Sequence, residues 1–205
     1  MGIANAQRTL EYIRTLTQFI SQPQYSDVVQ MFCVLNEPFI PDITAAPMES
    51  FYTEVYDVIR EVTGLGAGKG PWMVIHDGFN GVKSWANFLS GGDRISLDTH
   101  TYVAFDEPPH TDGLAAFPAM ACRNWQGQVK DSMSAFGLTN AGEWSFAIND
   151  CGHWVTGVDL GTRWEGQFSA THCPTRNGIC LTSLFSLVYR HVLVPHPSRL
   201  LRAVG

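Results

Sequence analysis

Two glutamates, Glu37 and Glu143, stand at the ends of apolar segments that have the length and composition of buried strands. Glycoside hydrolysis requires such a pair, because one carboxyl group protonates the leaving oxygen while the other attacks or stabilises the anomeric carbon. The two residues are 106 positions apart, which corresponds to three successive βα units of about 35 residues. We therefore expect them on the first and fourth of four strands that face each other across a barrel mouth.

Polar residues also end the two strands expected between these glutamates. His76 and Asp77 follow one apolar run, and His100 and Tyr102 close the next. In a parallel barrel the active site is built where the strands end, so these side chains are expected at the same mouth.

Each of these residues also has a plainer explanation. Glu37 could begin a loop, and His76 with Asp77 could form a turn after a strand. His100 could be a satisfied core histidine, and Glu143 could be a solvated strand end, although an acid between a buried strand and an aromatic residue is a poor solvent face. The tryptophans could be sugar platforms but are by default core residues: Trp72, Trp85, Trp125, Trp144, Trp154 and Trp164.

Extended and helical patterns alternate along the chain, which predicts an α/β fold. Strands are expected at 28–35, 72–77, 95–102 and 136–144, and helices at 10–20, 51–62, 82–89 and 115–133. The run 28–35 is apolar throughout, so we expect a strand buried on both faces, with Cys33 among the buried residues. Four βα units are half of a (β/α)8 TIM barrel, which typically needs about 250 residues, so the barrel is expected to be incomplete.

Charge is unevenly distributed. The net charge of -6 and a pI of about 5.6 argue against a nucleic-acid partner and suit a neutral substrate such as a sugar. All 19 acidic residues lie between Glu11 and Glu165, whereas the last 40 residues contain four arginines and no acid. The composition therefore predicts a change of character after Gly166.

The five cysteines show no CxxC pair and no Cys/His spacing of a zinc site, so we expect no metal. The N-terminus has neither the basic start nor the apolar run of a signal peptide, which taken alone favours an intracellular chain. The longest apolar stretch near the C-terminus is interrupted by Arg190 and His191 and is too short to span a bilayer.

Four motifs, VLNEP, IHDGF, DTHTYVAF and AGEWS, occur in this order. They resemble the fungal exo-β-1,3-glucanases of glycoside hydrolase family 5. QRTL and SQPQYSDVV before the first motif, VKSWANFL after the second and GTRWEG after the last extend the resemblance over about residues 5–168. The combination is specific, whereas NEP alone is shared with many related barrel glycosidases.

The resemblance implies a retaining mechanism without a cofactor. Glu37 would be the general acid and base, and Glu143 the nucleophile. Asn36 would hydrogen-bond the sugar 2-hydroxyl, and His100 would orient the carboxylate and sugar together with Tyr102. A further aromatic at the entrance would help to clamp the glucan chain, and it corresponds to Phe105.

The resemblance also implies a β-1,3-glucan substrate, an extracellular or cell-wall location and a monomer. Strands 4 to 7 of the family's barrel would be present in a domain of residues 1–168, followed by a divergent tail, 169–205. Cys151 would be bridged to Cys173 or Cys180, while Cys122 would lack its partner.

The chain departs from the family at both ends. About three βα units that would precede residue 5 have no counterpart, and neither does a strand ending in an FWxWK-like pattern after GTRWEG. Truncation could therefore leave the chain inactive. The alternatives are another family 5 β-glucanase or β-glucosidase, or a non-catalytic, vestigial glucan-binding protein.

Overall fold

The computed structural model describes residues 2–106, 114–145, 147, 154–155 and 157–162. The chain divides into two compact units, one of residues 1–101 with 118–144 and one of residues 102–117 with 145–205. The first unit contains all the strands that are described. The predicted domain boundary near residue 168 and the tail 169–205 lie outside the described residues.

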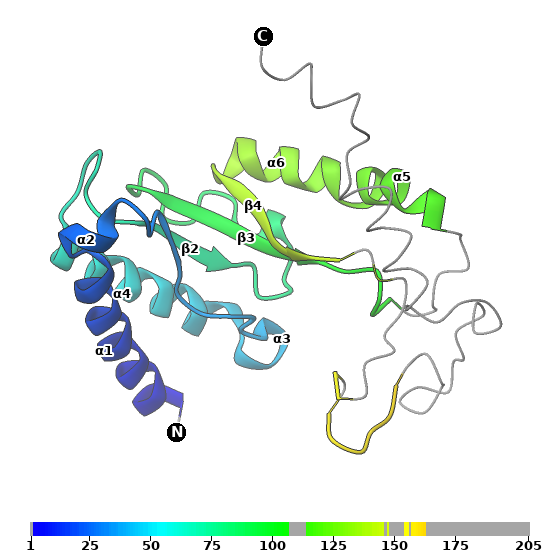
Figure 1. The fold of residues 1–205 in the computed structure, drawn as a ribbon, viewed down its shortest axis with the longest axis horizontal. Coiled ribbons are helices and arrows are strands. Elements are labelled where there is room, and N and C mark those ends of the chain that lie inside the picture. Colours follow the sequence, from blue (N-terminus) through cyan, green and yellow to red (C-terminus); the bar gives the residue numbers. More distant parts are fainter. Residues whose placement is uncertain (1, 107–113, 146, 148–153, 156, 163–205) are drawn as a thin grey trace, which may run out of the picture. The chain divides into compact units, whose positions relative to one another are not determined.

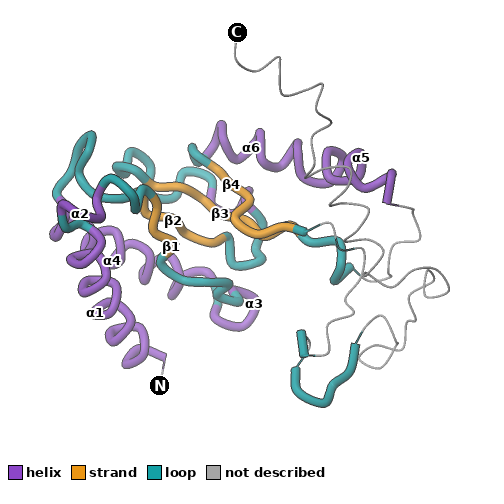
Figure 2. Tube along the Cα trace, in the orientation of Figure 1, coloured by secondary structure: helices purple, strands orange, loops and turns teal. Residues whose placement is uncertain are grey.

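The first unit is built on a four-stranded parallel sheet (Figures 1 and 2). Its strands lie in sequence order: β1 (Met31–Cys33), β2 (Trp72–His76), β3 (Ile95–Thr101) and β4 (Thr139–Trp144). Each strand pairs in parallel with the next one, as expected of successive βα units. The four predicted strands and the α/β class are confirmed, and closure into an eight-stranded barrel stays a prediction.

Helices precede β1 and connect β1 to β2 and β3 to β4. The long ones are α1 (Gly2–Ile20) and α4 (Ala45–Thr63), and shorter ones are α2 (Pro23–Ser26), α3 (Ile40–Ile43), α5 (Phe117–Ala121) and α6 (Gly127–Ala135). The single helix predicted at 115–133 is instead a 3₁₀ turn (Leu114–Ala116), α5, a π-helical turn (Cys122–Gln126) and α6. Between β2 and β3 only a 3₁₀ turn forms (Val82–Trp85). Among the described residues, no helix has the length and apolar character needed to cross a membrane.

The apolar core lies between the long helices and the sheet. Helix α4 buries Tyr52, Val55 and Ile59, at the spacing that puts apolar residues on one helical face. These side chains belong to one cluster with Ile75 of β2 and Leu97 of β3. Side chains alternate along a strand, so Leu97 points to the helices while its neighbours in the strand point to the opposite face. That opposite face carries the polar residues of the site.

Strand β1 differs from the prediction. It contains three residues instead of eight, and Met31 and Cys33 are exposed. The physical reason is that β1 is an edge strand: among the described residues it pairs with β2 and with no strand on its other side. The expectation of a strand buried on both faces, with Cys33 buried, is therefore wrong for this structure.

Candidate active site

The loop after β1 presents Glu37, whose backbone is held in an unusual conformation. Its φ of 45° lies in the left-handed region, which costs a non-glycine residue on the order of 1–2 kcal/mol. The loop is anchored to the loop after β2, because the Ile40 amide donates to the Gly78 carbonyl at 3.1 Å. Gly78 has a φ of 65°, and a Cβ there would lie 3.0 Å from the Pro38 carbonyl oxygen. Contact between the two loops thus fixes the position of the glutamate.

His100, on β3, brings the two predicted catalytic carboxylates together. Its Nδ1 lies 2.6 Å from Glu37 Oε1 and 3.4 Å from Glu143 Oε2. Since both oxygens contact one nitrogen, their separation cannot exceed the sum of these distances, about 6 Å. The His100 side chain is 3% exposed, whereas those of Glu37 and Glu143 are 35% and 43% exposed, so both acids reach solvent.

Asp77 stabilises the turn that follows β2. The Asp77 carboxylate accepts hydrogen bonds from the Phe79 amide and from Thr99 Oγ1, both at 2.9 Å, and the Asp77 carbonyl accepts one from Trp85 Nε1 at 2.9 Å. Trp85 itself is buried, which confirms the default expectation of a core residue for this tryptophan. Asp77 therefore has the structural role of a turn residue, one of the two explanations that the sequence left open.

His76 is fully buried next to His100, with ring centroids 4.2 Å apart and an interplanar angle of 62°. Burial lowers its pKa, and the nearby His100 acts in the same direction, while Asp77 opposes the shift. The Gly78 amide donates to His76 Nδ1 at 3.0 Å. In the neutral ring the proton is therefore on Nε2.

This tautomer bears on metal binding. Ligand atoms of Glu37, His76 and His100 lie within 4.8 Å of one another, a grouping that resembles a metal site. A histidine ligates through a nitrogen that carries no proton, and His76 Nε2 carries one because Nδ1 is engaged by Gly78. The arrangement fits a carboxylate and histidine cluster better than a metal centre.

The other predicted site residues are Asn36, Tyr102 and Phe105. Asn36 is exposed and its side chain makes no hydrogen bond among the described residues. Tyr102 and Phe105 belong to the second unit, where their rings pack at a centroid distance of 5.5 Å. The suggested partners Cys151, Cys173 and Cys180 lie outside the described residues, and Cys122 is a free, exposed thiol.

Sequence reasoning missed Asp98, which lies next to His100 Nε2, whereas the two glutamates lie next to Nδ1. Its Oδ2 is 3.3 Å from His100 Nε2, and the residue is 4% exposed. A signal for it was present, because residues two apart in a strand share a face and the motif DTHTY places an acid two residues before the histidine.

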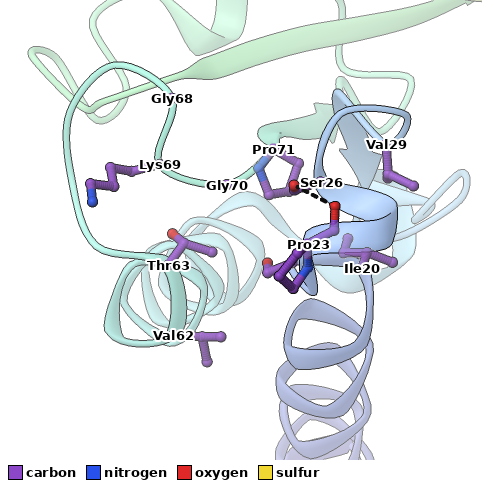
Figure 3. A pocket seen from close by; sticks show the side chains of 11 residues that line it. Ile20, Pro23, Ser26, Val29, Val62, Thr63, Gly68, Lys69, Gly70 and Pro71 are labelled. Carbon is purple, nitrogen blue, oxygen red and sulfur yellow. Dashed lines mark hydrogen bonds between the residues drawn. The ribbon is translucent and has the colours of Figure 1, made fainter.

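A separate cavity of about 320 Å³ lies among the ends of α1 and α4, helix α2 and the glycine-rich loop before β2 (Figure 3). Ile20, Pro23, Val62 and Pro71 are among the residues that line it. None of the predicted catalytic or substrate-binding residues contributes to its wall.

Comparison with known proteins gives matches that include three Aspergillus proteins, each named "Probable glucan 1,3-beta-glucosidase D". The chain is 32% identical over 186 residues to that of Aspergillus flavus, a match that covers 85% of the chain and 21% of the relative. The protein of Aspergillus niger is 32% identical over 188 residues, with 87% and 22% covered, and that of Aspergillus fumigatus 30% identical over 182 residues, with 85% and 21% covered. No family model matches the chain.

The chain thus spans about a fifth of the length of the curated relatives it matches. Within that span the strands of the sheet follow the order of the motifs in the sequence, and VLNEP and AGEWS each place a carboxylate at a strand end. The sequence identity to the matched proteins is in line with this resemblance. The chain is therefore similar to part of the fungal proteins named glucan 1,3-beta-glucosidase, in line with the resemblance that its motifs indicate.

Proposed function

We propose that the site hydrolyses β-1,3-glucan by a retaining double displacement. The single observation that carries this proposal is the meeting of Glu37 and Glu143 at His100 Nδ1. A separation of at most about 6 Å between the two oxygens supports retention, which uses carboxyl groups about 5–5.5 Å apart, over inversion, which needs roughly 6.5–9.5 Å.

In the first step the Glu143 carboxylate attacks the anomeric carbon, the glycosidic carbon–oxygen bond breaks, and Glu37 gives its proton to the leaving oxygen. In the second step Glu37 takes a proton from water as that water attacks the same carbon, and the bond to Glu143 breaks. Both acids regain their starting states. The exposure of both carboxyl groups is consistent with access for a sugar and for water.

The names of the relatives support a neutral glucan as the substrate, and the net charge of -6 is compatible with it. We further propose that the enzyme is exo-acting and that Asn36, Tyr102 and Phe105 contact the substrate. The proposal also includes a monomeric state and an extracellular or cell-wall location. Exo action predicts that glucose is released from laminarin from the first minutes, whereas endo action would release longer oligosaccharides first.

The test uses the chain grafted into the Aspergillus flavus relative in place of the matching residues, with Glu37→Ala, Glu143→Ala and, as a control, Glu49→Ala on the exposed side of α4. The first two variants should lose about 10²–10⁴-fold of laminarin turnover, and the control should keep it. Azide then separates the roles. It should replace water in Glu37→Ala to give β-glucosyl azide, and replace the nucleophile in Glu143→Ala to give α-glucosyl azide.

If both variants keep turnover, the proposal is wrong. Exchange of the two azide products would instead reverse the assigned roles of Glu37 and Glu143.

A further inference from the structure

Asp98 is a buried carboxylate to which nothing above assigns a role, and the neighbouring strand β4 supplies it with two hydrogen-bond donors. Its Oδ1 accepts hydrogen bonds from Asn140 Nδ2 at 2.6 Å and from the Gly142 amide at 2.5 Å, both on β4. Its Oδ2 faces His100 Nε2 at 3.3 Å. A buried carboxylate is costly unless each oxygen has a partner, and here the two oxygens are engaged on different sides.

The surroundings fix which way this carboxylate faces. Ser96 Oγ donates to Asn140 Oδ1, which holds the amide so that its NH₂ group points to Asp98. Gly142 leaves the required room, because a Cβ at that position would lie 2.6 Å from Asp98 Oδ1 and nearer still to Oδ2. The pair of Asp98 and Gly142 thus depends on the absence of a side chain at residue 142.

The surroundings of the two ring nitrogens bear on where the protons of His100 lie. The Asp98 carboxylate lies 3.3 Å from His100 Nε2, and because a carboxylate accepts hydrogen bonds, its place beside Nε2 favours a proton on that nitrogen. In the neutral ring Nδ1 then has a free lone pair. At 2.6 Å from Glu37 Oε1 a second proton must lie between the two atoms, since two lone pairs would otherwise face each other.

We propose that Asp98 is a positioning residue, which holds His100 in the Nε2–H form so that Nδ1 accepts the acid proton of Glu37. In this arrangement the carboxyl group of Glu37, the proposed general acid, is held by a hydrogen bond to His100 before the leaving oxygen arrives. The catalytic meaning of this arrangement rests on the proposed function, whereas the position of the protons on His100 does not.

The most direct test is nitrogen-15 NMR of the His100 ring in the unmodified chain near pH 7, with the ring signals assigned by their loss in His100→Gln. Nε2 should carry a directly bonded proton. If Nε2 is unprotonated, the proposal is wrong, and this measurement requires no variant of Asp98 to fold.

Asp98→Asn provides a second, opposite prediction. The amide oxygen is held by the two donors on β4, so the new NH₂ group faces His100 Nε2 and requires a lone pair there. The proton should therefore move to Nδ1, and the two ring signals should exchange between the protonated and unprotonated positions. The matched control is Asp57→Asn on the exposed side of α4, which should leave the spectrum of His100 unchanged.

In the graft described above, Asp98→Asn should lower kcat at least about 10-fold with little change in KM, because a neighbour that sets the orientation and proton of a functional histidine contributes on that scale. If the proton of His100 moves from Nε2 to Nδ1 in Asp98→Asn but the parent graft hydrolyses no glucan, the role of Asp98 is supported and the proposed function is refuted. Hydrolysis by the parent, with Nε2 still protonated in Asp98→Asn, would refute the proposal and preserve the function.

Discussion

Replacing Gly142 by Ala perturbs the contact between β3 and β4 at a single point. The new Cβ would lie 2.6 Å from Asp98 Oδ1 and 2.7 Å from its Cγ, against ordinary contacts of 3.4–4 Å. The carboxylate must therefore move by roughly 1 Å, away from the two donors at 2.5 and 2.6 Å. The backbone adds no strain of its own, because the φ of Gly142 lies outside the left-handed region.

The cost can be bounded from two contributions. Forcing extra volume into a packed site costs typically 1–3 kcal/mol, and a weakened hydrogen bond to a charged group costs about 1.5–3 kcal/mol. These contributions overlap, because moving the carboxylate relieves the first at the expense of the second. We expect Gly142→Ala to lower the free energy of unfolding by about 2–4 kcal/mol.

The assay is urea unfolding at pH 7 followed by tryptophan fluorescence, with Gly127→Ala as the control. Gly127 has helical dihedrals, φ -63° and ψ -45°, and nothing lies within 4 Å of its added Cβ. The control should therefore stabilise the chain by up to about 1 kcal/mol. A loss below about 0.5 kcal/mol in Gly142→Ala would show that Asp98 is not held as described.

Three further outcomes are expected. Ile75→Ala should lower the free energy of unfolding by about 2–5 kcal/mol, because Ile75 is 0% exposed. The control Ile3→Ala, at a residue that is 83% exposed, should change it by less than about 0.5 kcal/mol, and similar losses in the two variants would refute the core assignment. Because the fold lowers the pKa of His76, the unfolded chain binds a proton on this histidine at higher pH than the folded chain does, and the free energy of unfolding should fall below about pH 6.5 with a slope approaching 1.4 kcal/mol per pH unit. A His76→Gln variant with the same slope would contradict this prediction. The 205-residue chain alone should turn over laminarin far more slowly than the graft, because among its described strands both edges of the sheet are unpaired, and equal turnover per mole would refute this.

Periodicity and motif order predicted the parts of the fold that depend on local pattern. The strands at 72–76 and 95–101 and the helix α4 were found nearly as expected, since each carries a buried face that the sequence displays. The burial of β1 could not be predicted in this way, because it depends on whether a strand lies on its other side. The interruption of the helix at 115–133 by a π-helical turn has no signal in the apolar spacing that we recognise.

The same limit applies to the site. Glu37, His100 and Glu143 could be predicted because each residue type matches the chemistry at a strand end, and the structure brings them together. Asp98 and Gly142 were harder to find, because their roles come from contact between two strands that are about 40 residues apart in the chain. Apart from the spacing of Asp98 and His100 in DTHTY, an acid in a strand interior or a glycine before a glutamate indicates little until the register of β3 and β4 is known.

The most direct measurement for the central claim is covalent trapping of the nucleophile. The graft would be incubated with 2-deoxy-2-fluoro-β-glucosyl fluoride, which forms the glycosyl-enzyme faster than water removes it, and the labelled peptide would be identified by mass spectrometry. The label should lie on Glu143 and should be absent from the Glu143→Ala variant. A label on Glu37, or hydrolysis that proceeds without any covalent adduct, would contradict the account.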